Sequence, residues 1–176
     1  MLQRVKIKLT RPLLGDKRTS GNLRRFQRDK SAACLELEPD FWFWTVRQAI
    51  IALGHDVEVD ESTISVPGRV EVPSLVLYTH GYYGRDGRRR EDQFECIRSG
   101  ALLTFEILIT ESREKDGRRA PTVTELRSIL SFVGKHLGIS PWGSKFNFGR
   151  FELLELETKI RRLATEQIDT AKNHSE

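Results

Sequence analysis

The residues whose chemistry is easiest to interpret lie between Gly138 and Gly149, near the end of the chain. Glycines let a backbone approach a ligand closely, and Gly138 also stands where a helix would end in a left-handed residue. Rings and cations accompany these glycines, and such side chains stack on bases and neutralise phosphates. The alternative is an ordinary helix-to-strand loop packed by its own aromatic side chains. The nucleic-acid contacts predicted here are Trp142, Gly143, Lys145, Phe146 and Gly149.

Positive charge is concentrated in segments without a hydrophobic period. The chain of 176 residues holds 29 Lys and Arg against 25 Asp and Glu, a formal net charge of +4. Fifteen of these 29 cations lie in segments 11–30, 81–93 and 111–120. The first two resemble a groove that follows a phosphate backbone and offers rings for stacking, whereas the third, with mixed signs, is typical of a solvated surface. The contacts predicted there are Arg11, Lys17, Arg18, Arg24, Arg25, Arg28, Lys30, Tyr82, Tyr83, Arg88, Arg89 and Arg90.

The sequence contains no familiar catalytic or metal-binding motif. Its two cysteines, Cys34 and Cys96, are not spaced as zinc ligands, and no phosphate-loop signature is present. Of the four histidines, only His80 has a suggestive setting, beside Tyr82 and Tyr83, for acid or base catalysis on a 2′-hydroxyl. We therefore expect a protein that is not an enzyme and needs no cofactor or metal. A metal-independent endoribonuclease using His80 is the alternative.

Composition predicts one globular domain. Hydrophobic residues make up 38% of the chain and charged residues 31%. The N-terminus lacks a run of signal-peptide type, and the longest apolar stretch, 41–53, is too short and too often interrupted to span a bilayer. These features predict a cytoplasmic protein with no membrane partner.

Hydrophobic patterning in the first third predicts two strands and a helix. Residues 4–10 alternate between apolar and basic, as in a half-buried strand, and 32–37 suggest a second, short strand. Asp40 is a good N-cap for a helix over 41–53, which Gly54 would end. Because this helix is apolar on nearly all sides, we expect it to be buried.

Long loops are predicted between these elements. Segment 11–30 shows no apolar period, although Leu23 and Phe26 could belong to a short helix inside it. Segment 81–93 is rich in turn-forming and basic residues, and segment 111–120 is charged.

Extended runs dominate the middle of the chain. Residues 63–66 and 69–72 flank the turn signal Pro67–Gly68, which predicts a hairpin. A denser apolar strand is expected over 74–79, and the clearest alternation covers 101–110.

A second helix and a last strand follow. Thr122 and Glu125 have the spacing of a capping box. The last strand is expected over 149–156, with a bulge or two-sided burial at Leu153–Leu154, and a polar helix over 159–171. The apolar stripe of the second helix comprises Val123, Leu126, Leu130, Val133 and Leu137.

This order predicts an α+β fold of the ferredoxin-like, RRM-like βαββαβ type, with an extra hairpin, long basic insertions and a C-terminal helix. The predicted domain spans 1–157, and 158–176 form a helix or tail. The strand at 101–110 carries Thr104 and Glu106 on its second face instead of the aromatic residues of a standard RNA-recognition motif.

Three segments resemble the RAMP superfamily of CRISPR-associated RNA-binding proteins, especially its crRNA-backbone subunits. They are 9–15 (LTRPLLG), 98–110 (RSGALLTFEILIT) and 138–157 (GISPWGSKFNFGRFELLELE). A typical family ending has Gly-Ile-Gly and then Gly-Phe-Gly-Arg-Phe, and the chain has Gly-Ile-Ser at 138–140 and Asn-Phe-Gly-Arg-Phe at 147–151. Ser140 and Asn147 thus stand where the family has glycines. Small phage-carried relatives are similar too.

The resemblance implies a ferredoxin-like domain whose glycine-bearing loop, between the last helix and the last strand, contacts RNA. It implies RNA or another single-stranded nucleic acid as partner, with CRISPR-complex subunits or self-association as further partners, and a role in antiviral defence. Some relatives cleave RNA with a histidine, which is the basis of the His80 alternative. Another alternative is a phage protein that mimics or blocks a CRISPR subunit.

Overall fold

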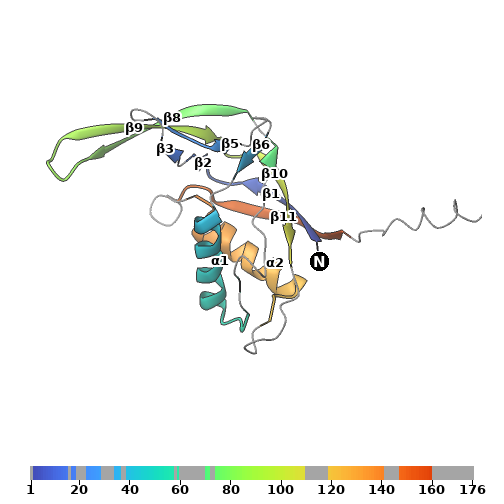
Figure 1. The fold of residues 1–176 in the computed structure, drawn as a ribbon. Coiled ribbons are helices and arrows are strands. Elements are labelled where there is room, and N and C mark those ends of the chain that lie inside the picture. The colour runs from blue at the N-terminus through green and yellow to red at the C-terminus, as the bar shows by residue number, and fades with distance from the viewer. Residues whose placement is uncertain are drawn as a thin grey trace, which may run out of the picture.

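The computed structural model describes residues 2–15, 17–18, 23–28, 34–36, 39–57, 59, 70–71, 74–109, 119–140 and 147–159. These residues form a helix-covered sheet from which a long β-hairpin extends (Figure 1). The predicted α+β fold with a ferredoxin-like arrangement is confirmed. The predicted C-terminal helix and the strand at 63–66 lie outside the described residues.

The central sheet has the order β10-β1-β11, and both pairings are antiparallel. Its strands are β1 (Leu2–Leu9), β10 (Leu102–Leu108) and β11 (Phe151–Lys159). Alternate residues of β1 and β10 are buried, because every second side chain of a strand points to the same face. The strands predicted at 4–10, 101–110 and 149–156 are therefore confirmed, although β11 begins two residues later and ends three residues later than expected.

A bulge in β11 changes which of its side chains face the core. Lys6 pairs with Glu155 while the next residue, Ile7, pairs with Leu153, so that Leu154 is the extra residue. Leu154 is 39% exposed, whereas Leu156 is buried. The irregularity predicted at Leu153–Leu154 is confirmed, and it is a bulge instead of two-sided burial.

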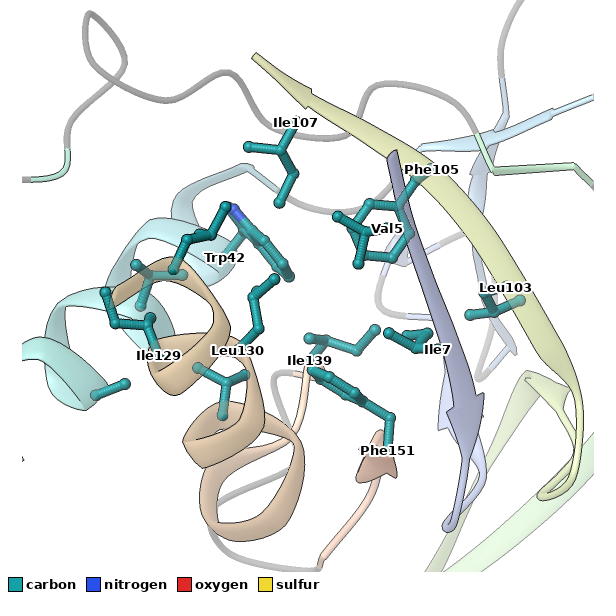
Figure 2. Packing of buried hydrophobic residues seen from close by; sticks show 14 of the residues in the cluster. Val5, Ile7, Trp42, Leu103, Phe105, Ile107, Ile129, Leu130, Ile139 and Phe151 are labelled. Atoms are coloured by element: carbon teal, nitrogen blue, oxygen red, sulfur yellow. The ribbon is translucent and has the colours of Figure 1, made fainter. Parts of the chain in front are cut away.

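Two helices cover one face of this sheet: α1 (Pro39–Leu53) and α2 (Val123–Phe132), which continues into the π-turn η1 (Val133–Leu137). The core lies between them and the sheet (Figure 2). The Trp42 ring meets the Phe105 ring edge-on, with centroids 5.9 Å apart. The predicted stripe of α2 faces this core, since Leu126, Leu130 and Val133 are buried.

Two predictions about α1 are wrong. The helix begins at Pro39, so Asp40 lies within its first turn instead of capping it; proline is favoured at the first helical position. The helix is also not buried all round, because Trp44 is 44% and Ile51 73% exposed. A helix that packs against one side of a sheet leaves the residues on its far side exposed, whether or not they are apolar.

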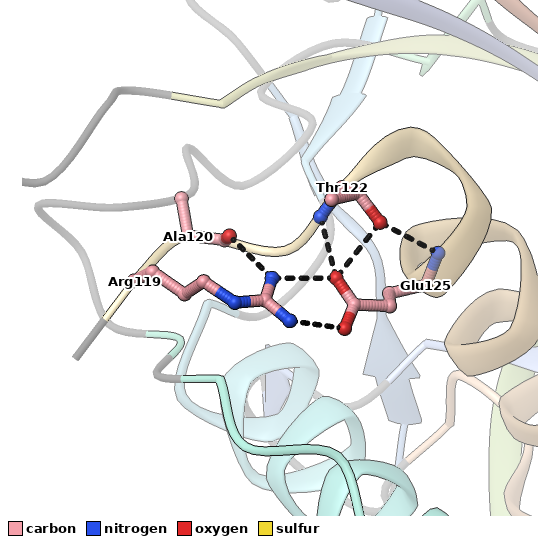
Figure 3. A network of polar contacts seen from close by, with 4 residues as sticks. All are labelled: Arg119, Ala120, Thr122 and Glu125. Carbon is pink, nitrogen blue, oxygen red and sulfur yellow. Dashed lines mark hydrogen bonds and ion pairs between the residues drawn. The ribbon is translucent and has the colours of Figure 1, made fainter.

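The start of α2 is fixed by a polar network (Figure 3). The Glu125 backbone N–H donates to the Thr122 hydroxyl, and the Thr122 N–H donates to the Glu125 carboxylate at 2.8 Å. Arg119 donates to the same carboxylate through both terminal nitrogens, at 2.7 and 2.5 Å. The guanidinium of Arg119, together with Thr122, holds the pKa of Glu125 far below its usual range. The predicted capping box is confirmed.

Short strands border the central sheet. β5 (Gln27–Arg28), β6 (Cys34–Glu36) and β7 (Val70–Glu71) form a small antiparallel sheet, and β7 contacts β10. β6 confirms the strand predicted at 32–37, and β7 corresponds to the centre of the strand predicted at 69–72.

The hairpin consists of β8 (Leu75–Tyr83) and β9 (Arg89–Ile97), which pair over their full lengths. β2 (Leu13–Leu14), β4 (Leu23–Arg25) and β3 (Lys17–Arg18) complete its sheet. We call this unit the arm.

The structure of the arm corrects three predictions made for segments that were expected to be loops. Segment 81–93 is strand except for the turn at 84–88, and segment 11–30 contains β2 to β5. The helix considered around Leu23 and Phe26 is wrong, because Leu23 belongs to β4. Most residues of 81–93 are exposed whichever face they lie on, so this segment lacks the alternating burial that produces a period of two in the sequence.

Among the described residues, no helix has the length and apolar character needed to cross a membrane.

Candidate nucleic-acid interface

A row of rings runs along one face of β8. Tyr78, His80 and Tyr82 are alternate residues of the strand and therefore point the same way. Neighbouring ring centroids lie 6.5 and 6.4 Å apart, with interplanar angles of 19° and 15°. A strand advances about 3.3 Å per residue, so this spacing follows from the backbone. It also equals about two nucleotide rises of roughly 3.4 Å each, which suits stacking of bases.

Further rings extend the row at its base. Phe94 is opposite Tyr78 on β9 and is buried with Leu14 and Cys96. Phe148, from the loop before β11, packs edge-on against Tyr78 with centroids 5.5 Å apart. Two segments distant in sequence thus meet on one surface. We call this surface the ladder face; its residues are Arg24, Tyr78, His80, Tyr82, Phe94 and Phe148.

Arg24 supplies a cation beside the rings. Its guanidinium carbon lies 5.9 Å from the centroid of the Phe94 ring, and its Nε lies 3.8 Å from Oδ2 of Asp92. The cation–π contact orients the side chain over the aromatic base of the ladder face. Arg18 of β3 is opposite Arg24 in the backbone register, so two predicted phosphate contacts occupy neighbouring strand positions.

At the tip of the arm, acids hold two of the predicted arginines. Arg90 donates to Asp86 at 2.9 Å, and Arg89 donates to Glu91 at 3.1 Å. The bond from Arg90 lowers the pKa of Asp86 below its usual value, with help from the Arg88 backbone N–H. Among the described residues, no ion pair involves the side chain of Arg88, which lies in the turn. Arg88 is therefore the predicted tip contact with the most available charge.

The Tyr82–Tyr83 pair is separated by the strand. Tyr82 belongs to the ladder face, whereas Tyr83 points to the opposite face and is 76% exposed. Leu77 lies on that opposite face as well and is 66% exposed. Both tyrosines are predicted nucleic-acid contacts, and alternation along β8 places them on two different surfaces.

Other predicted contacts have roles inside the fold. Arg25 Nε lies 3.8 Å from Oε1 of Glu95, whose other oxygen accepts the backbone N–H of Phe26 at 3.1 Å. The Gly149 N–H donates to the Pro12 carbonyl at 2.6 Å, and the Gly149 carbonyl accepts from Ile139 at 3.0 Å. The backbone of Gly149 is thus committed to the fold.

Some predicted residues are not placed by the structure. Lys17, Arg18 and Arg28 are described by their backbone alone. Lys30, Trp142, Gly143, Lys145 and Phe146 lie outside the described residues.

His80, the alternative catalytic residue, lies between the rings of Tyr78 and Tyr82 and opposite Asp92. This position in the row suits a ring on which a base can stack. In the described part of the chain, no group of three or more His, Cys, Asp or Glu side chains could hold a metal ion.

Sequence reasoning missed Tyr78 and Phe94 as site residues and used His80 only as a candidate catalyst. A signal was present: Tyr78, His80 and Tyr82 repeat at the period of a strand. Interpreting 81–93 as a loop concealed that period. Phe94 and Phe148 join the site through tertiary packing, for which the sequence alone carries no signal.

No protein-family model matches the sequence, and the search of curated proteins gives no match. Among solved structures, the chain is similar to a chain of the cryo-EM structure of the Type III-B Cmr-beta bound to cognate target RNA. The TM-score is 0.60 and the sequence identity 17%, and the match covers 89% of this chain and 59% of the other. The similarity establishes a shared fold, and the chain spans about three fifths of its neighbour's length.

Proposed function

We propose that the protein binds single-stranded RNA on the ladder face without cleaving it, as a RAMP-like protein of a CRISPR-related assembly. The observation that carries this proposal is the row of Tyr78, His80 and Tyr82 beside the cation of Arg24. Rings stack on any base, and arginines neutralise phosphates, so this combination suits a single strand without strict sequence preference.

Two further observations support the proposal. The structural neighbour belongs to a particle described as bound to target RNA, and it shares the fold over most of this chain. The segments at 98–110 and 138–157, which resemble RAMP proteins, contain β10 and most of β11. Partners among CRISPR-complex subunits, self-association, antiviral defence and phage origin are parts of this proposal.

A strand on the ladder face would place bases against the rings and its phosphates near Arg24 and Arg88. The tip pairs Arg90–Asp86 and Arg89–Glu91 are exposed, so phosphates can compete with these acids at little cost. Lys145, Trp142 and Phe146 of the glycine-bearing loop remain proposed contacts.

The two tyrosines at the end of β8 offer a matched test. We expect Tyr82→Ala to weaken binding of a fluorescein-labelled 15-nucleotide RNA about 5- to 150-fold, because one base–ring stack contributes roughly 1–3 kcal/mol. Tyr83→Ala removes the same side chain from the opposite face and should change affinity less than twofold. Fluorescence anisotropy measures both, and equal effects of the two variants would refute the assignment of the ladder face.

A protein-interaction role is the second candidate, and the exposed Leu77 and Tyr83 favour it. A protein partner that copurifies after nuclease treatment and a high-salt wash, and is lost with Leu77→Ser, would support this candidate. The ribonuclease alternative predicts that His80→Ala abolishes cleavage of RNA; absence of cleavage by the parent protein would remove it.

A further inference from the structure

A cavity of about 590 Å³ lies where the end of β1, the turn η1 and the start of β11 meet. It is distinct from the ladder face, although both reach the short segment 147–150. The polar and charged side chains that matter for its chemistry are Arg11, Lys135, His136, Asn147, Arg150 and Glu152.

Arg150 lines this cavity, and one donor of its side chain has no partner in the described part of the chain. Its Nη2 donates to Oδ1 of Asn147 at 3.0 Å. Its Nη1 is buried and has no hydrogen-bond partner among the described residues. An unsatisfied buried donor costs roughly 1–3 kcal/mol, and more when it carries charge. An acceptor with negative charge would relieve that cost.

Asn147 is held in a conformation that serves Arg150. Its φ of 61° is the only positive value among the described residues other than glycine. Asparagine tolerates this left-handed region better than most residues, yet the conformation still has a cost. Here it brings the Asn147 amide oxygen to the guanidinium and fixes the orientation of the side chain.

The π-turn η1 forms the second wall. The Gly138 N–H donates to the Val133 carbonyl at 2.7 Å, which widens the last turn of the helix. A Cβ on Gly134 would lie 2.3 Å from the Phe151 carbonyl oxygen, so only glycine permits this close approach to β11. The result places Lys135 and His136 at the cavity. Such π-turns are frequent at functional sites.

The charge around the cavity favours an anion. With His136 neutral, three cations (Arg11, Lys135 and Arg150) face one carboxylate, Glu152. Lys135 and His136 also offset the partial negative charge of the helix end beside them. Burial lowers the pKa of Arg150, but a guanidinium remains charged at neutral pH.

We propose that this cavity binds one phosphate group of a nucleotide, with Arg150 as its main ligand and Arg11 and Lys135 as supporting cations. The planar guanidinium, oriented by Asn147, suits charge-assisted bonds to phosphate oxygens. The phosphate can come from a free mononucleotide or from the end of an RNA strand. Only the second source rests on the proposed function.

The test is titration of the whole protein with adenosine 5′-monophosphate by isothermal calorimetry, with adenosine as the ligand that lacks phosphate. We expect the monophosphate to bind and adenosine to bind at least tenfold more weakly. Arg150→Gln and Lys135→Gln should each weaken monophosphate binding, about 10- to 100-fold for Arg150, since charge-assisted bonds contribute roughly 1.5–3 kcal/mol.

A matched variant controls for net charge. Arg4→Gln removes one cation near the other end of β1, roughly 20 Å from Arg11 by the rise of a strand, and should leave monophosphate binding unchanged. Lys135 is exposed, so its variant is expected to fold even if the Arg150 variant does not. Equal binding of adenosine and its monophosphate would overturn the proposal, as would equal effects of Arg4→Gln and Lys135→Gln.

Two comparisons separate the sources and the two sites. A 5′-phosphorylated RNA that binds more tightly than its 5′-hydroxyl form, with the difference lost in Lys135→Gln, would assign the phosphate to a strand end. Without such a difference, monophosphate binding assigns the cavity to a free nucleotide. Tyr82→Ala should leave monophosphate binding intact, so the cavity and the ladder face can fail independently.

Discussion

Two sheet surfaces of this protein are exposed and charged, yet they are built differently. The face of the β10-β1-β11 sheet away from the helices carries Lys6 paired with Glu155 at 2.9 Å, and Lys159 paired with Glu106. We call it the free face. Its described strand residues include no aromatic ring. The ladder face has rings at regular spacing and a cation beside them.

The difference shows why the number of charges is a poor guide to a binding surface. Both faces contain lysine or arginine, and on both a cation lies near a carboxylate of a neighbouring strand: Lys6 near Glu155 on the free face, and Arg24 near Asp92 on the ladder face. A standard RNA-recognition motif binds with the face that corresponds to the free face, whereas here the rings are on the arm. The distribution of rings, more than that of charges, distinguishes the two surfaces.

The largest expected effect on RNA binding comes from removing two rings of the ladder face, which makes it more like the free face. The double variant Tyr78→Ala/Tyr82→Ala should weaken RNA binding by about 30-fold or more, because two stacks contribute roughly 2–6 kcal/mol together. Anisotropy with the 15-nucleotide RNA measures it. The matched double variant of the free face, Arg4→Gln/Lys6→Gln, should cost less than threefold. A larger loss for the free-face variant would reverse the comparison.

The second prediction concerns what supports each face. The ladder face rests on a small cluster of Leu14, Phe94 and Cys96, while the central sheet rests on the main core. Phe94→Ala should therefore loosen the arm and leave the sheet intact, with arm amides losing up to about 3 kcal/mol of protection. Hydrogen exchange followed by mass spectrometry measures this. Equal loss of protection in β1 and β10 would show that arm and sheet unfold as one unit.

The third prediction tests the polar network of Arg119, Thr122 and Glu125 that fixes the start of α2. Because the folded-state pKa of Glu125 is depressed, its carboxylate stabilises the fold above its unfolded pKa of about 4.3, and this contribution declines as the pH falls further. Glu125→Gln should lower the free energy of unfolding by about 1 kcal/mol at pH 6, since Arg119 is half exposed and solvent screens the pair. Urea denaturation at pH 6 and pH 3 measures the difference.

At pH 3 the parent and the Glu125→Gln variant should be closer in stability than at pH 6. A difference that grows on acidification would contradict the assigned ion pair. RNA binding at pH 6 should be equal for the two proteins, because the network lies at the start of α2 and not in the arm.

The smallest expected effect is that of Lys6→Gln on stability. Lys6 and Glu155 are both exposed, and such pairs contribute roughly 0.2–1 kcal/mol. The midpoint of urea denaturation should shift only slightly, and less than in Glu125→Gln. A larger shift for Lys6→Gln would mean that the free face depends on its ion pairs more than its exposure suggests.

The sequence predicted the central sheet and its helices well, but not the row of rings on the arm, and the reason is physical. The strands at β1 and β10 and the stripe of α2 each have one buried face, which leaves a clear period in the sequence. Segment 81–93 of the arm is mostly exposed on both faces, so it carries turn-forming and charged residues at positions that are nevertheless paired. Cross-strand partners such as Tyr78 and Phe94 follow from register, which a single sequence does not display.

The cavity at η1 had a partial signal. Gly138 was expected to end the helix, and its φ of 80° agrees. The widened turn before it depends on close packing of Gly134 against Phe151, a tertiary contact. The sequence shows Arg150 as a cation near glycines, but it does not show that the Nη1 donor of this side chain is buried.

The central claim is that a nucleic-acid strand lies on the ladder face. Photo-crosslinking with an RNA containing 4-thiouridine, followed by trypsin and mass spectrometry, tests it most directly. We predict crosslinks in the tryptic peptide 70–85, at Tyr78 or Tyr82, and their loss in the double tyrosine variant. Crosslinks in peptide 99–113, which contains β10 of the free face, with none in 70–85, would contradict the account.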